Sequence, residues 1–170
     1  MNYIGIDPGQ NGGLVCIDDT KTVILRYAFK KSAEKYIDIL DFIKHLQMIS
    51  ERNAIVILED VHSIFGMSAK SNFSFGYICG LLYGIIKCLN YECIKVQPKV
   101  WQKEILGDME KIKKANLKSN DTKKMALIKS IELFPEFNNL ATPRCSKPHD
   151  GLIDALLIAE YGRRINDKLR

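Results

Sequence analysis

Four acidic residues in this chain stand where apolar stretches of the sequence meet polar ones. They are Asp7, Glu59, Asp150 and Asp154, and none has an obvious basic partner beside it in the sequence. Carboxylate oxygens are the ligands that hard divalent cations such as Mg²⁺ and Mn²⁺ prefer. Because like charges repel, a cluster of acids is tolerable when a cation neutralises it. The pattern predicts a metal-dependent enzyme that acts on a phosphate ester.

The elements expected around these acids would bring them together. Asp7 and Glu59 each end a short apolar stretch typical of a strand, and carboxylates at strand ends point into the crevice beyond the sheet. Asp150 and Asp154 are four residues apart at the start of an apolar helix, so they share one helical face. We expect the four side chains to hold two Mg²⁺ or Mn²⁺ ions and to support in-line, two-metal hydrolysis of a phosphodiester.

Each acid also has a simpler interpretation. Asp7 could be a turn residue before Pro-Gly, Glu59 could be a surface residue, and Asp150 could do no more than begin a helix. Asp154 is harder to explain in this way, because it precedes an apolar helical run in which a lone acid is costly. His149 could be a metal ligand, a proton shuttle or a capping residue. The combination is more specific than any single member.

Basic residues add a second signal. The formal net charge of +5 permits a polyanionic partner without demanding one. Lysines gather between residues 99 and 124, either as a solvated charged loop or as a surface that contacts phosphates, and the acids favour the second interpretation. Lys123 is the candidate catalytic cation, because an ammonium group near the scissile phosphate could stabilise developing charge or orient water. The candidate nucleic-acid contacts are Lys70, Lys99, Lys113, Lys114, Lys118 and Lys124.

Length and composition fit an ordinary globular domain that spans residues 1–170. The 170 residues are 46% apolar and 26% charged, which excludes a disordered tail and a membrane protein. The first residues lack the basic start and cleavage site of a signal peptide. Five cysteines without zinc or redox spacing are typical of free buried thiols. We therefore expect an intracellular protein in a reducing compartment.

The pattern of apolar residues predicts an α/β layer fold. The expected strands are 3–7, 14–17, 23–27, 54–58 and 93–96, of which the first three form an antiparallel meander and the fourth is buried on both faces. The expected helices cover 33–52 with a cap at Ser32, a short segment around Trp101, a segment from Asn120 or Asp121 to Phe134, and about 149–164. Residues 61–72 and 107–119 are expected to be loops. Trp101 is expected in the core rather than as a stacking platform for a base.

The remaining helix, expected over 73–89, is apolar almost all round, which predicts that it is buried. Gly76, Gly80 and Gly84 repeat every four residues along one face of it. Because each glycine costs roughly 1 kcal/mol inside a helix, we expect a groove for close backbone approach. Another helix of the same chain or a second subunit could occupy that groove.

Three of these segments resemble the motifs of the RuvC-type Holliday junction resolvases, which belong to the RNase H-like superfamily. Ile4-Gly5-Ile6-Asp7-Pro8-Gly9 is similar to the first motif, Ile57-Leu58-Glu59 to the second, and 150–159 to the C-terminal helix motif. Segments 75–85 and 96–101 are similar to the phage, viral and chloroplast branches. The resemblance covers nearly the whole chain in the right order.

The resemblance implies an RNase H-like mixed five-stranded sheet with helices on both faces. It also implies a homodimer that binds four-way DNA junctions and makes paired nicks with Mg²⁺ or Mn²⁺. The four acids would be the metal ligands, and the helix over 73–89 would form most of the dimer interface. Bacterial members space the last two acids by three residues rather than four. They also carry an aromatic wedge near the places that His62 and Phe65 take here.

Other functions remain open at this point. The same nuclease site could act on other branched DNA or on RNA/DNA hybrids, or the chain could bind junctions without cutting them. A strand that ends in Gly-x-Asp-x-Gly also begins actin-like ATPase and sugar kinase domains. Those enzymes need a second, similar domain, for which 170 residues leave no room.

Overall fold

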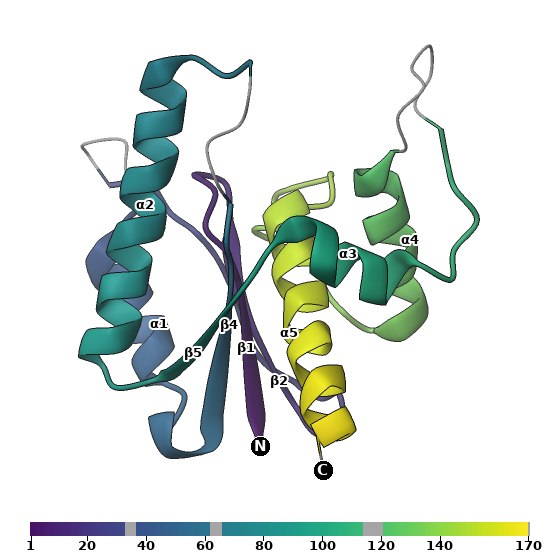
Figure 1. Ribbon diagram of the computed structural model, residues 1–170, viewed down its shortest axis with the longest axis horizontal. Coiled ribbons are helices and arrows are strands. Elements are labelled where there is room, and N and C mark those ends of the chain that lie inside the picture. The colour runs from purple at the N-terminus through teal and green to yellow at the C-terminus, as the bar shows by residue number, and fades with distance from the viewer. Residues whose placement is uncertain (33–36, 62–65, 114–120, 170) are drawn as a thin grey trace.

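A mixed five-stranded sheet forms the centre of the computed structural model, which describes residues 1–32, 37–61, 66–113 and 121–169 (Figure 1). The strands are β1 (Asn2–Asp7), β2 (Gly13–Asp18), β3 (Val23–Ala28), β4 (Ala54–Glu59) and β5 (Glu92–Val96). Their order is β3-β2-β1-β4-β5, with the first three antiparallel and with β4 and β5 parallel to β1. The expected mixed sheet and its antiparallel meander are confirmed.

Helices cover both faces of the sheet, as expected. The helices are α1 (Ile39–Gln47), α2 (Ala69–Cys88), α3 (Pro98–Leu106), α4 (Thr122–Leu133) and α5 (Asp150–Leu169), and a short 3₁₀ turn covers Glu51–Asn53. Figure 1 shows α1 and α2 on one face and α3, α4 and α5 on the other. No helix in the described ranges is long and apolar enough to cross a membrane.

The two faces of β1 and β4 divide the core into two apolar clusters. Tyr3 and Ile57 belong to the cluster under α3, α4 and α5, whereas Ile4 and Val56 belong to the cluster under α1 and α2. This alternation follows from the two-residue period of a strand. Both strands are therefore apolar along their length, and the expectation that 54–58 is buried on both faces is confirmed.

Two glycines allow α5 to lie directly on the sheet. A Cβ atom on Gly5 would clash with the backbone of Ala155 and Ala159, and one on Gly151 would clash with the backbone of Asn11 and Gly12. Side chains at these positions would push the helix away, so the short distance between α5 and β1 requires glycine. Because α5 runs antiparallel to β1, its first turn lies beside the end of β1 (Figure 1).

The first helix is shorter than expected. It begins at Ile39, and the side chain of Asp38 caps it by accepting a hydrogen bond from the backbone of Asp41, so the proposed Ser32 cap is wrong. Ile37 instead forms an isolated antiparallel bridge with Lys31. Residues 33–36 of the expected helix lie outside the described residues. Apolar residues before Ile39 have helical spacing, but the isolated bridge and the Asp38 cap prevent the helix from beginning earlier.

The second helix differs from its expectation in two ways. It begins at Ala69 because Ser68 caps it, accepting a hydrogen bond from the Ser71 backbone, so the last part of the expected 61–72 loop is helical. Its burial is also one-sided, because Ile78, Leu82 and Ile86 alone among its residues are buried. The expectation of a helix buried all round is wrong.

The glycine face of α2 is open among the described residues. Cβ atoms added to Gly76, Gly80 and Gly84 would meet nothing within 4 Å. A groove of about 590 Å³ follows these glycines, bordered by apolar side chains that include Leu81 and Ile85. Phe73, 73% exposed, lies near the start of the helix. No described helix of the same chain fills the groove. Among the described residues, this excludes a helix of the same chain as the occupant and leaves the second subunit.

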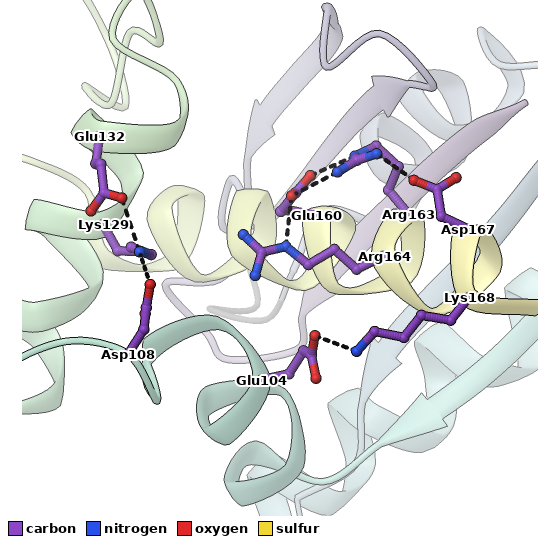
Figure 2. Close-up of polar contacts among 9 residues, drawn as sticks. All are labelled: Glu104, Asp108, Lys129, Glu132, Glu160, Arg163, Arg164, Asp167 and Lys168. Atoms are coloured by element: carbon purple, nitrogen blue, oxygen red, sulfur yellow. Dashed lines mark hydrogen bonds and ion pairs between the residues drawn. The ribbon is translucent and has the colours of Figure 1, made fainter.

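The last helix continues to Leu169 rather than ending near Arg164, because ion pairs stabilise its polar end (Figure 2). Glu160 is fully buried and accepts hydrogen bonds from Arg163 and Arg164, both at 2.8 Å. Lys168 reaches Glu104 on α3 at 2.7 Å. The neighbouring Lys129 of α4 is likewise buried and paired with Asp108 and Glu132. The Lys168–Glu104 pair thus links α5 to α3, and the Lys129–Asp108 pair links α4 to the segment that follows α3.

Candidate metal centre

Asp7 and Glu59 end two neighbouring strands at the same edge of the sheet. Strands β1 and β4 are parallel, and Ile6 pairs with Leu58, so the two acids follow directly in register. Parallel strands end at the same edge, which is where the sequence predicted that both carboxylates would lie. The backbone N–H of Gly9 donates to Oδ1 of Asp7 at 3.0 Å and fixes that side chain in the turn.

The start of α5 supplies the other two acids. The close approach of Gly151 to the β1–β2 turn holds the first turn of the helix over the end of β1. Asp150 is exposed at the first helical position, and Asp154, one turn later, is partly buried. The four-residue spacing therefore places Asp150 at the rim and Asp154 deeper in the same site.

The pKa values of the acids show that they lie within electrostatic range of one another. Burial raises the pKa of Asp154 to about 8, and the charges of Asp7, Glu59 and Asp150 add to the effect. Burial also raises the pKa of Glu59 to about 7, with a further increase from Asp7. The pKa of Asp7 is raised by burial, against the Gly9 hydrogen bond and Lys123, while Asp150 raises it further. All four carboxylates thus influence one site.

These carboxylates are neighbours and not yet a finished coordination shell. Within the described ranges, no group of three or more acidic, histidine or cysteine side chains is already gathered closely enough to hold a metal ion. The chemistry of the donors nevertheless fits a hard divalent cation, because they are oxygen ligands whose negative charges are partly buried together. A cation would draw inward side chains that otherwise repel one another.

Lys123 lies at the rim of this cluster. Its Nζ atom contacts Oδ2 of Asp150 at 2.5 Å, and both side chains are exposed. The hydrogen bond with Asp150 raises the pKa of Lys123, and the charges of Asp154 and Asp7 act in the same direction. Lys123 lies on α4, and the side chain of Asp121 caps this helix by accepting a hydrogen bond from the backbone N–H of Lys124. Asp121 is therefore confirmed as the cap.

His149 caps the last helix. Its Nδ1 atom accepts a hydrogen bond from the backbone N–H of Leu152 at 3.2 Å. Burial lowers the pKa of His149, although the nearby charge of Asp150 opposes the change. The capping interpretation is therefore confirmed, and the neutral ring holds the start of the helix that presents Asp150 and Asp154.

Sequence reasoning missed two neighbours of the site. The indole N–H of Trp101, a core residue as expected, donates to Oε1 of Glu59 at 2.7 Å. Cys79 on α2 has its pKa raised to about 11 by burial and by the charges of Asp7, Asp60 and Glu59, which shows that α2 borders the acids. The position of Trp101 soon after a strand end was the available signal, whereas nothing local marks Cys79.

The candidate DNA contacts occupy several surfaces. Lys70 borders a pocket of about 380 Å³ between Gln10 and the first turns of α2. Lys99 in α3, Lys113 before the undescribed segment and Lys124 in α4 are exposed. The other candidates, Lys114 and Lys118, and the possible wedge residues His62 and Phe65 lie outside the described residues.

Comparison with known proteins gives the fold independently. No family model matches the sequence, and no curated protein sequence matches it significantly. The solved structure of RuvC from Thermus thermophilus superposes with a TM-score of 0.63 at 17% identity, covering 98% of this chain and 97% of RuvC. RuvC from the same organism in complex with a Holliday junction substrate gives 0.60 at 16% identity, covering 97% and 96%. The chain therefore has the RuvC-type, RNase H-like fold.

Proposed function

We propose that this protein is a metal-dependent endodeoxyribonuclease that resolves four-way DNA junctions by paired symmetric nicks. The observation that carries the proposal is the electrostatic coupling of four carboxylates from β1, β4 and α5 at one edge of the sheet. Acids shifted together in this way are typical of functional sites, because a folded chain has no structural need to gather like charges.

Asp7, Glu59, Asp150 and Asp154 would hold two Mg²⁺ or Mn²⁺ ions. Such ions, when bound, supply an activated water and stabilise the leaving 3′-oxygen of the phosphodiester. The protein contributes no nucleophile of its own. Its four acids would position the ions. The packing of α5 against Gly5 keeps Asp154 beside the two strand-end carboxylates.

Lys123 would provide positive charge for the scissile phosphate. In the structure its ammonium group pairs with Asp150 at the rim of the site. Engagement of Asp150 with a cation would release that group toward the substrate, where it could stabilise developing negative charge. The side chain of Lys123 is 71% exposed, so its ammonium group is accessible to a bound phosphate.

Branched DNA would contact the basic surface around this edge. The net charge of +5 and the exposed lysines 70, 99, 113 and 124 support binding to phosphates, and lysines 114 and 118 would extend the surface. Contacts of this kind release counterions, so binding should weaken steeply with salt. The T. thermophilus RuvC with the same fold is described in complex with a Holliday junction, which favours this substrate over linear DNA.

A homodimer would supply the two sites that paired nicks require. The open glycine groove of α2 supports a second copy as its occupant, because its lining is apolar and because α2 also borders the acids. A two-fold axis beside α2 would place two copies of the site symmetrically.

Five free cysteines further support a reducing, intracellular environment.

Cleavage of synthetic DNA tests the proposal. We expect the parent protein with Mg²⁺ to nick a mobile four-way junction symmetrically, and to cut forked DNA, linear DNA and RNA/DNA hybrids poorly. Asp7→Asn and Glu59→Gln should bind the junction but cut it at least 100-fold more slowly, since each removes a proposed ligand. Preferential cleavage of an RNA/DNA hybrid or of forked DNA would show that this nucleic acid, and not the four-way junction, is the substrate. Junction binding by the parent without any cutting would support a non-catalytic role.

A further inference from the structure

Trp101 makes a direct contact with one of the four acids. Its indole N–H donates to Oε1 of Glu59 at 2.7 Å, and its side chain is only 1% exposed. It is the one tryptophan of the chain. No other hydrogen bond of the indole N–H is found within the described residues, so rotation of Glu59 would leave a buried donor without a partner.

The backbone around this contact is well defined by the sheet. Strand β5 pairs in parallel with β4 so that Val96 lies opposite Glu59. The carbonyl of Val96 accepts the N–H of Asp60 at 2.7 Å, and α3 begins two residues later at Pro98. The first turn of α3 therefore carries the indole to the carboxylate from a fixed starting point.

We propose that Trp101 is the positioning residue for Glu59, holding Oε1 by its hydrogen bond and leaving Oε2 available to a divalent cation. This inference rests on the metal-binding function proposed above. A free glutamate has several rotamers and must lose that freedom when it binds a cation. The indole removes part of this loss in advance. Hydrogen bonds that orient metal ligands commonly change metal affinity 10- to 100-fold.

A purely structural role would give a different result. Trp101 belongs to the apolar cluster that also contains Ile105, one turn further along α3 and fully buried. Trp101→Phe keeps an aromatic ring in this cluster but removes the N–H donor. Ile105→Val is the matched control, because it disturbs the same packing without touching Glu59.

Metal affinity without DNA is the main measurement. Calorimetric Mn²⁺ titration of the full chain should show affinity about 10-fold weaker in Trp101→Phe and nearly unchanged in Ile105→Val. In a background of Glu59→Ala, which removes the acceptor of the indole N–H, Trp101→Phe should cause no further loss, because Trp101 acts through the carboxylate. Junction cleavage by Trp101→Phe should need about 10-fold more Mg²⁺ but should approach the parent rate at saturation. Junction affinity in Ca²⁺ should stay the same.

A second measurement does not depend on how the variant folds. The single indole N–H resonance of the parent should exchange slowly with solvent and should shift in a saturable way during a Mg²⁺ titration. Equal Mn²⁺ affinity in parent and Trp101→Phe, an equal loss in Ile105→Val, or an indole resonance that ignores Mg²⁺ would overturn this inference alone. Failure of the parent to bind Mn²⁺ or Mg²⁺ would overturn the proposed function and this inference together.

Discussion

At the acid site, the contribution of Asp154 to the free energy of unfolding depends on pH. Burial and three neighbouring carboxylates all disfavour the charged form of Asp154, whose pKa of about 8 lies far above its ordinary value of 3.8. Lys123 at the rim opposes only part of this effect. Ionisation of Asp154 is therefore disfavoured at neutral pH, and a bound divalent cation would favour it.

The first prediction is that Asp154→Asn stabilises the metal-free protein at alkaline pH. Because the pKa of Asp154 is higher in the folded state, the folded state binds the proton more tightly. Its stabilising contribution is complete below about pH 4 and is lost as pH rises toward about 8. The variant should gain on the order of 1–3 kcal/mol in free energy of unfolding at pH 8.5, and little at pH 4.

Urea unfolding with a chelator, at both pH values, checks this prediction. Glu136→Gln, which changes an exposed carboxylate away from the acids, is the matched control and should have little effect at either pH. Added Mg²⁺ should stabilise the parent more than Asp154→Asn. Equal pH dependence in the parent and the variant would show that folding does not raise the pKa of Asp154.

At the scale of elements, the contact between α5 and β1 decides whether the acids meet. That contact depends on Gly5, where the helix backbone leaves no room for a Cβ atom. Trp101 makes a similar connection from α3 to β4. Two strands and two helices thus meet at one edge, and small changes in their packing should reach the carboxylates.

The second prediction is that Gly5→Ala damages both the fold and the site. The added methyl group must displace α5, which should cost about 3 kcal/mol of unfolding free energy and weaken Mn²⁺ binding. Gly84→Ala is the matched control within a single chain, because a Cβ atom there meets nothing of the described chain within 4 Å. That control should stabilise the protein by up to about 1 kcal/mol through helix propensity. Calorimetry and chemical unfolding of both variants measure these effects, and similar behaviour of the two would contradict the proposed packing.

For the whole molecule, the open face of α2 is the feature that a single chain leaves unexplained. One side of this helix packs through Ile78, Leu82 and Ile86, while the glycine side faces an apolar groove. A groove of this kind is typical of an interface. Paired nicks also need two active sites, so the same face connects assembly with the proposed activity.

The third prediction is that Gly80→Leu separates the proposed dimer without harming the fold. A leucine would occupy the groove, so the dimer dissociation constant should rise at least 10-fold, as measured by analytical ultracentrifugation. Because leucine favours helices over glycine, the monomer should be as stable as the parent monomer or more stable by up to about 1 kcal/mol. Nicks in the two strands of a junction should then become uncoupled. Gly80→Ala serves as the small-residue control, and an unchanged dimer in Gly80→Leu would place the interface elsewhere.

Much of the fold was predictable because its signals are local. Short apolar runs rich in isoleucine and valine, such as 54–58, and the Pro-Gly turn after Asp7 mark the sheet and its connections without reference to distant residues. The start of the last helix was likewise marked by Asp150 and by the apolar run after it. The prediction of helix bounds was wrong where a helix cap or a β-bridge competes with the helical spacing of apolar residues, as at Asp38 and Ile37.

By itself, the sequence determined which residues could bind a hard cation and at which element ends they stand. Only the tertiary structure decided that Gly5 brings α5 onto β1, that Trp101 of α3 reaches Glu59 at the end of β4, and that the glycine face of α2 stays open. The reason is physical. Periodicity and capping act over a few neighbouring residues, whereas a shared site depends on how closely elements far apart in the chain can pack.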